Sequence, residues 1–289
     1  MLQLPLMNTA ILLISCPDRK GITASITDFI YRNNGNIEHA DQHIDAQSNT
    51  FFMRIEWSLA GFSLPKKDIP KAFKKLSDKF KMNWSLYFSE NIPRIAIFAS
   101  FEMHCLYDLL LKWKQKDILC EIPLIVSNHR IVDKIAKDFG IKFVYSPKNP
   151  ANKREVEKNE LALLKKENIE LVVLARYAQI FTKQFVDTFP NRIINIHHSF
   201  LPAFIGRNPY EQAYRRGVKI IGATSHYVTR ELDAGPIIEQ DTVRVSHRNS
   251  LRDLKREGQD LERTVLSRAV RWHLERKILV YNNKTVVFD

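Results

Sequence analysis

Residues 10 to 88 switch repeatedly between strand-like and helix-like spacing of apolar side chains. Ile22, Ile26 and Ile30 recur at helical spacing, whereas the runs on either side of the polar turn at residues 46–49 are typical of strands. The resulting order, βαββαβ, predicts a ferredoxin-like unit. The predicted strands are 10–15, 37–44, 50–59 and 83–88; one predicted helix runs from Ile22 to Asn34-Gly35 and the other covers residues 68–80.

A polar segment containing Pro93 separates this unit from a second pattern. Beyond it, short apolar runs alternate with amphipathic helical stretches, and the run at residues 171–175 is apolar throughout, as in a buried strand. This alternation predicts a Rossmann-like, mostly parallel sheet with helices on both faces. We therefore expect an α/β protein with two domains, residues 1–90 and 91–289. Further predicted strands are 95–99, 122–126 and 143–145, and predicted helices include 132–139 and 153–168.

Ligands of such sheets bind beyond the carboxyl ends of the strands, where residues 176–180 and 195–199 are expected to lie. The first strand-to-helix turn of this domain, residues 100–105, contains no glycine. It therefore cannot form the glycine-rich phosphate cradle of a dinucleotide or P-loop site.

The stretch from Ile193 to Gln240 carries candidate catalytic side chains. Asn195 and His197 alternate with isoleucines, so an amide and an imidazole leave one side of a predicted strand just before Pro202 ends it. Asp233 precedes a Gly-Pro turn, which suits close approach of backbone to a ligand. Asn and His at a strand exit are also common turn formers, so spacing alone leaves both interpretations open.

Composition places the chain among globular proteins, with 289 residues, 45% hydrophobic and 26% charged. The net charge of +12 allows nucleic-acid binding, but much of the basic excess falls on two predicted helical faces, which are usually solvated. The aromatic pattern of an RNA-recognition motif is absent, because Phe51 and Phe52 are adjacent and face opposite ways. A basic surface equally favours an anionic small molecule, and we expect no nucleic-acid partner.

No apolar run has the length of a membrane span, and the residues from Met1 to Asn8 lack the features of a secretory signal, so we expect no membrane association. The three cysteines, Cys16, Cys105 and Cys120, lack the spacing of metal ligands and suit a reducing compartment. We therefore expect a cytoplasmic protein without a metal site.

Several motifs together resemble the formyltetrahydrofolate deformylase family. They are Asn-Ile-His-His-Ser-Phe-Leu-Pro-Ala-Phe from Asn195, Asp-Ala-Gly-Pro-Ile-Ile from Asp233, and Leu-Ala-Arg-Tyr ending at Tyr177. The resemblance covers nearly the whole chain from Ile11. It implies an enzyme of the formyltransferase fold that hydrolyses 10-formyltetrahydrofolate to tetrahydrofolate and formate, without a cofactor. Such a reaction supplies formate for purine synthesis and balances one-carbon pools. The alternatives are a formyltransferase with an amine acceptor, or a non-catalytic folate-sensing or RNA-binding protein.

The resemblance also implies roles at the site. Asn195 would donate to the oxyanion of a tetrahedral intermediate, His197 would donate to it or carry protons, and Asp233 would orient the imidazole and activate water. The segment from Arg176 would hold the pterin by its backbone, with apolar walls from Tyr177 and Ile180. The implied substrate-binding set is Arg176, Tyr177, Ala178, Gln179, Ile180, His198, His226, Glu231 and Leu232. Ala178 stands where relatives commonly have Met, and Ile205 and Arg207 also depart from the usual pattern, which bears on folate affinity.

The loop Cys-Pro-Asp-Arg-Lys-Gly-Ile-Thr, residues 16–23, resembles an ACT domain, a small-molecule sensor. The resemblance implies that this loop and the following helix N-terminus bind an amino-acid effector. The implied effector-binding residues are Asp18, Arg19, Gly21 and Ile22. A unit that serves only for dimerisation is the alternative, and in either case we expect a homo-oligomer.

Overall fold

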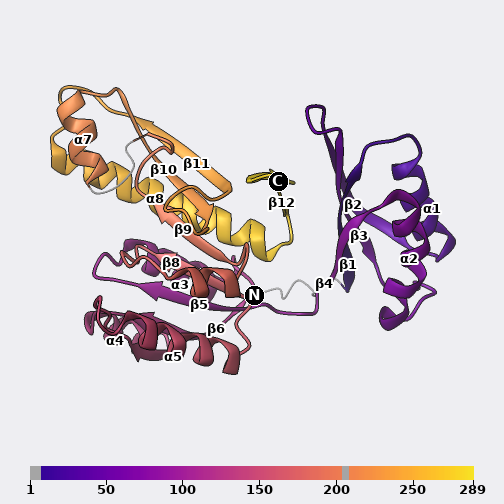
Figure 1. Cartoon of the computed structure of the whole chain (residues 1–289), viewed down its shortest axis with the longest axis horizontal. Helices are drawn as coiled ribbons and strands as arrows, with labels where there is room; N and C mark the ends of the chain where they lie inside the picture. The colour runs from indigo at the N-terminus through magenta and orange to yellow at the C-terminus, as the bar shows by residue number, and fades with distance from the viewer. Residues whose placement is uncertain (1–7, 204–207) are drawn as a thin grey trace. The chain divides into compact units, whose positions relative to one another are not determined.

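The computed structural model describes residues 8–203 and 208–289. The chain divides into two compact units (Figure 1). One holds the residues up to Ile92 with Arg276–Leu279 and Val286–Asp289, and the other holds Pro93–Glu275 with Val280–Thr285. None of the described helices is both long and apolar enough to span a membrane.

The first unit is a four-stranded antiparallel sheet with the strand order β2-β3-β1-β4. Two helices and a short 3-10 turn connect the strands, in the order expected for a ferredoxin-like unit. The elements are β1 Thr9–Pro17, α1 Ile22–Arg32, β2 Asn36–Asp45, β3 Thr50–Ser58, η1 Lys66–Asp68, α2 Ile69–Phe80 and β4 Asn83–Phe88.

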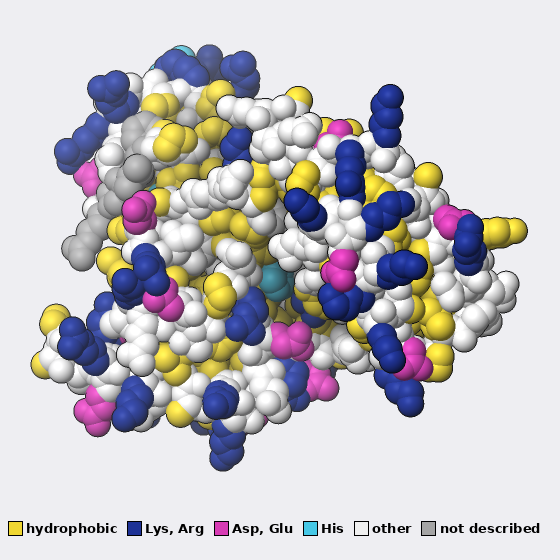
Figure 2. Space-filling model, turned by 45° about the vertical axis from the view of Figure 1, so that its right-hand side comes forward, with side chains coloured by type: hydrophobic (Ala, Val, Ile, Leu, Met, Phe, Trp, Pro, Cys, Tyr) yellow, Lys and Arg dark blue, Asp and Glu magenta, His cyan; other side chains and the backbone are white. Residues whose placement is uncertain are grey.

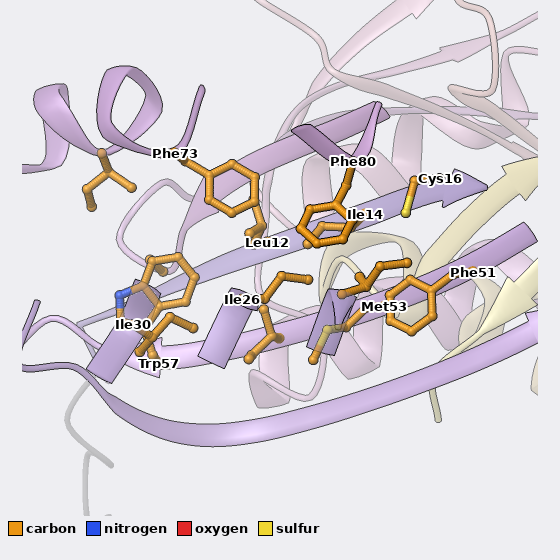
Figure 3. Packing of buried hydrophobic residues seen from close by; sticks show 14 residues of the cluster. Leu12, Ile14, Cys16, Ile26, Ile30, Phe51, Met53, Trp57, Phe73 and Phe80 are labelled. Carbon is orange, nitrogen blue, oxygen red and sulfur yellow. The ribbon is translucent and has the colours of Figure 1, made fainter. Parts of the chain in front are cut away.

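Both helices of this unit pack on one face of its sheet. Ile22, Ile26 and Ile30 lie on one stripe of α1 and are at most 2% exposed. They join Phe73 of α2 and alternate side chains of β1 and β3, such as Leu12, in one apolar cluster (Figure 3). The 3.6-residue period of the helices and the two-residue period of the strands thus build this core.

The second unit contains a seven-stranded sheet in the order β11-β10-β9-β8-β5-β6-β7. Strands β5 to β9 are parallel, whereas β10 runs antiparallel to both β9 and β11. The strands are β5 Arg94–Ala99, β6 Glu121–Ser127, β7 Lys142–Tyr145, β8 Leu171–Ala175, β9 Ile193–His197, β10 Ile220–Tyr227 and β11 Ile237–Arg244. The helices are α3 His104–Gln115, α4 Ile131–Asp138, α5 Lys153–Lys166, α6 Lys183–Thr188, α7 Pro209–Arg216 and α8 Leu251–Leu274.

Helices cover this sheet in layers. Alternate residues of β5, β6 and β8, among them Phe98, pack with Leu164 of α5 and Phe185 of α6. Helix α8 packs against β9, β10 and α3. The chain leaves β5 toward β6 in one direction and later returns to β8 on its other side, so the strand order reverses between β5 and β8. The segments after these two strands occupy the usual ligand-binding position of such a sheet.

The predicted fold class is confirmed: an α/β chain with a ferredoxin-like unit followed by a mostly parallel sheet. Some elements were not predicted. They include the short helices α6 and α7, and strands β12 Ile278–Tyr281 and β13 Lys284–Val287, which form a terminal two-stranded sheet.

Candidate active site

Strand β9 delivers two polar side chains to the edge of the second sheet where it ends. Asn195 lies opposite His226 of β10, and His197 lies opposite Thr224 in the same antiparallel pair. Both histidines are buried: His197 is 5% exposed and His226 is 1% exposed. The strand pairing therefore brings an amide and two imidazoles together from residues far apart in sequence.

Asp233 reaches this edge from the loop between β10 and β11. Its backbone is left-handed, with φ 53°. Gly235 follows closely under the end of β10, where a Cβ atom would lie 1.8 Å from the carbonyl oxygen of Tyr227. The loop is held on its other side by Asn283, whose Nδ2 donates to the carbonyl oxygen of Ala234 at 2.9 Å. Glycine at 235 is thus required because the backbone of this loop approaches the backbone of β10, whereas its place in the sequence predicted close approach to a ligand.

Asp233 divides its carboxylate between two histidines. Oδ2 lies 3.3 Å from Nδ1 of His197, and Oδ1 lies 3.6 Å from Nε2 of His226. Nδ1 of His226 lies 3.0 Å from the carbonyl oxygen of Tyr227, so that nitrogen carries a proton and donates it. In the neutral ring Nε2 then accepts from Asn195 Nδ2 at 3.3 Å. One amide N–H of Asn195 is used in this way, and no other group among residues 8–203 and 208–289 bonds this side-chain amide, so its second N–H can serve a ligand.

Electrostatics keep Asp233 ionised. Burial alone would raise the pKa of this carboxyl, but the interaction with His226 and the positive potential of the His197 ring lower the pKa below its usual value. At neutral pH Asp233 is therefore an acceptor only. Each carboxylate oxygen has two lone pairs, so Asp233 can accept from a water molecule in addition to an imidazole.

His198 points to a different environment from that of His197. Burial and the nearby Arg176 guanidinium lower the pKa of His198 to about 3, so the ring is neutral at physiological pH. Its ring lies 5.3 Å from that of His197 and 5.6 Å from that of Tyr210, measured between centroids. A neutral imidazole here can orient water or substrate but contributes no positive charge.

The segment after β8 offers free backbone groups. Residues 177–181 lie in no helix or strand, and within residues 8–203 and 208–289 they make no backbone-to-backbone hydrogen bonds. Ala178 is exposed and Ile180 is 60% exposed, so both face outward. Tyr177 instead turns inward, with its ring 5.3 Å from that of Phe98. Tyr177 and Ile180 were both expected to form apolar walls for the pterin, but only Ile180 lies on the outer face of this loop.

Arg176 begins the loop in a left-handed conformation, with φ 58°, and its side chain is tied to two carboxylates. Its guanidinium lies 2.7 Å from Glu102 and 3.1 Å from Glu262 of α8. Glu262 also accepts from Tyr210 at 2.5 Å and contacts His104 at 2.8 Å. Burial alone would raise the pKa of Glu262, but the hydrogen bond with His104 and the charge of Arg176 lower it, so this carboxylate is charged at the core of the network.

Glu102, His104 and Glu262 were missed by sequence reasoning. His104, Cys105 and Glu262 place their ligand atoms within 4.8 Å of one another, a spacing that a metal ion could use. However, the Arg176 guanidinium already lies against Glu262, and burial raises the pKa of the Cys105 thiol well above its usual value. A cation at this place would meet a positive neighbour and a protonated thiol.

The remaining candidate residues lie as follows. Glu231 and Leu232 are exposed on the loop that carries Asp233, while Ile205 and Arg207 fall outside the described residues. In the first unit, Gly21 precedes α1 with φ 90°, and Asp18 N donates to the carbonyl oxygen of Asn49 at 2.9 Å. Arg19 is exposed and packs on the Phe80 ring, whereas Ile22 is 2% exposed and belongs to the core. The loop therefore presents polar groups, with Ile22 as its apolar anchor.

The basic excess does not gather in one patch on the visible face. Figure 2 shows Lys and Arg side chains spread over much of this face, with Asp and Glu side chains between them. A spread of this kind is typical of a solvated surface.

Each of the two units matches a known protein family. The profile of the formyl transferase family matches residues 93–270, and that of the ACT domain matches residues 10–64. The formyltetrahydrofolate deformylase of Synechocystis sp. is 56% identical over 97% of this chain and 98% of the relative, and that of Bacillus subtilis is 48% identical over 96% and 93%. The crystal structure of a formyltetrahydrofolate deformylase from Pseudomonas syringae matches with a TM-score of 0.95 at 44% identity, covering 98% of this chain and 95% of that one.

Proposed function

The chain belongs to the formyltetrahydrofolate deformylase family, and we propose that Asp233, His197 and Asn195 carry out the hydrolysis in this protein. The reaction converts 10-formyltetrahydrofolate and water to tetrahydrofolate and formate. The observation that carries the assignment of residues is the position of the Asp233 carboxylate, 3.3 Å from His197 Nδ1 and 3.6 Å from His226 Nε2, which itself contacts Asn195.

The geometry suggests a role in the hydrolysis for each of these three side chains. Asp233 holds the attacking water and accepts a proton from it as the oxygen bonds to the formyl carbon. The oxyanion that forms receives hydrogen bonds from the free N–H of Asn195 and from His197, which donates through Nε2 when both ring nitrogens are protonated. Collapse of the intermediate breaks the bond from carbon to N10, and the proton taken from water passes to that nitrogen. The hydroxyl proton that remains on the released formic acid is lost to solvent, which gives formate.

His226 acts one step away from the reacting atoms. Its Nδ1–H is committed to the carbonyl oxygen of Tyr227, which fixes the ring orientation. Its Nε2 accepts from Asn195 in the neutral ring and can donate to Asp233 when that nitrogen is protonated. We assign His226 the role of holding the Asn195 amide and the Asp233 carboxylate at the angle that catalysis requires.

The substrate lies along the outer face of residues 176–180 in this proposal. The backbone groups of residues 177–181 are not used within the fold, and a pterin presents an edge of alternating donors and acceptors that can pair with such a backbone. Ile180 supplies the apolar contact, and Ala178 leaves room where a larger side chain would narrow the face. His198, Glu231 and Leu232 border the same edge of the sheet.

The ACT unit gives this protein a regulatory ligand in our proposal. The loop at residues 16–21 opens into α1 through Gly21, and Asp18 and Arg19 are the polar side chains that would recognise a free amino acid. ACT units commonly associate, so we also propose that the protein is a homo-oligomer.

A turnover assay without any amine acceptor tests the hydrolase directly. We expect one formate for each 10-formyltetrahydrofolate consumed. Strict dependence of formyl loss on an added amine, such as glycinamide ribonucleotide, would instead identify a transferase and contradict the proposal.

A further inference from the structure

Lys148 lies between β7 and α5 with its side chain only 1% exposed. Its ammonium is 2.7 Å from Oε2 of Glu160 and 3.9 Å from Oε1 of Glu157. The same nitrogen lies 4.5 Å from the centroid of the Phe181 ring and 5.4 Å from that of Tyr177. One buried cation is thus enclosed by two carboxylates and by rings of the segment that follows β8.

Stability alone does not account for this cluster. Removing an ammonium and two carboxylates from water is unfavourable, and a well-packed apolar replacement is often at least as stable. Burial is also the main reason that the pKa of Glu160 is raised above its usual value, despite the nearby Lys148. A buried group of charges gives something that apolar packing does not, namely a fixed direction for each partner.

The cluster contacts residues 177, 181 and 182, which lie in the segment after β8 at residues 176–182. This segment is the substrate loop of the proposed function. Oε2 of Glu157 accepts from the backbone N–H of Thr182 at 3.0 Å and from its hydroxyl at 2.5 Å. The Thr182 hydroxyl in turn accepts from Phe185 N as the N-cap of α6. The end of the loop is therefore tied to α5 through Glu157, while Lys148 fixes two of its rings.

The other end of the loop is tied in the same manner. Arg176 is held by Glu102 and Glu262. Between the two anchors lie Ala178 and Ile180, which are exposed, and a backbone that makes no hydrogen bonds to other backbone groups of the described chain. A loop that is fixed at both ends and unpaired in its middle presents a set of donors and acceptors in a defined geometry.

We propose that Lys148, Glu157 and Glu160 are positioning residues that set the affinity of the loop at residues 176–182 for the folate. They do not touch the reacting atoms, so they act on substrate binding and leave the chemical step nearly unchanged. The inference rests on the proposed function only in naming the folate as the ligand of this loop.

The test uses the full-length protein and the variant Thr182→Val, which keeps the shape of the side chain and removes the hydroxyl shared by Glu157 and Phe185. We expect KM for 10-formyltetrahydrofolate to rise about tenfold, equivalent to about 1.4 kcal/mol, while kcat stays within about threefold. Thr182→Ser restores the hydroxyl and should restore KM. Ser250→Ala is the matched control, because it also removes an N-cap hydroxyl but does so at α8.

A second readout does not depend on catalysis. Hydrogen exchange of the hydrogen-bonded amides of Thr182, Phe185 and Val186 should accelerate about tenfold in Thr182→Val and in Lys148→Met, and should keep its wild-type rate in Ser250→Ala. An unchanged KM in Thr182→Val, or an equal rise in Ser250→Ala, would overturn the inference. If the wild-type protein released no formate, the proposed function would fail instead, and hydrogen exchange alone would then decide whether the cluster positions the loop.

Discussion

Replacing Gly235 by alanine perturbs the active site without removing any catalytic group. The added Cβ would lie 1.8 Å from the carbonyl oxygen of Tyr227 and 2.9 Å from its carbonyl carbon. Both atoms belong to the backbone at the end of β10, so no side-chain rotation relieves the contact. The loop that carries Asp233 must therefore move away from the strand.

The size of that movement follows from the contact. Real Cβ contacts essentially never fall below 3.0 Å, so a separation of 1.8 Å requires a displacement of about 1.2 Å. Asp233 stands two residues earlier and lies 3.3 Å from His197. A misplacement of about 1 Å in a catalytic group is worth about 10²-fold in rate. The overpacking itself should destabilise the fold by about 1–3 kcal/mol.

The assay compares kcat and urea unfolding of Gly235→Ala with those of Gly217→Ala. Gly217 has φ 62° and open space around it, so alanine there introduces backbone strain of about 1 kcal/mol and no collision. We expect a loss of about 10²-fold in kcat for Gly235→Ala and near-normal kcat for Gly217→Ala. A folded Gly235→Ala protein with kcat within threefold of wild type would refute the reasoning.

Three further predictions concern other groups. Asp233→Asn should keep folate binding and lower kcat by at least about 10²-fold, because the acceptor charge is lost while the shape remains; near-normal kcat would remove Asp233 from its role. Since His198 has a pKa of about 3 in the folded state against 6.5 normally, the unfolded chain binds the extra proton, and stability should fall by up to about 1.4 kcal/mol per unit as pH drops from 6.5 toward 3. Urea unfolding of His198→Gln should show a shallower fall over that range. Asp18→Ala should abolish any amino-acid effect on turnover, as measured by titration calorimetry and formate release, and binding that survives this change would place the effector elsewhere.

Much of the fold follows from apolar periodicity. The spacing of Ile22, Ile26 and Ile30 predicted α1, and the fully apolar run at residues 171–175 predicted the buried strand β8. The terminal sheet of β12 and β13 was not predicted, although its two four-residue strands flank the Asn-Asn turn at residues 282–283, which is a hairpin pattern. Strand length alone does not explain this, because β7 also has four residues and was predicted.

The candidate active site could be predicted from the sequence because its polar residues stand out from their apolar or turn-forming neighbours. Asn195 and His197 are polar side chains within an apolar run, and Asp233 stands at a turn that glycine and proline mark clearly. Polar side chains are conspicuous within an apolar strand because they are normally exposed to water. The pairing of β9 with β10, which brings His226 to Asn195, depends on the order of strands and could not be obtained from spacing.

The buried ion clusters were not predicted from the sequence, because charged residues of an amphipathic helix normally lie on its solvent-exposed face. Glu157 and Glu160 of α5 nevertheless precede Leu164 by seven and four positions, so they lie on the same stripe as a buried leucine. Glu262 of α8 likewise continues the stripe formed by Leu254, Gly258 and Val265. A carboxylate on an apolar stripe cannot be solvated and must find a cation or several donors within the fold. The position of these residues on the helix was therefore a usable signal, and it leads to the two anchors, Arg176 and Thr182, that hold the substrate loop.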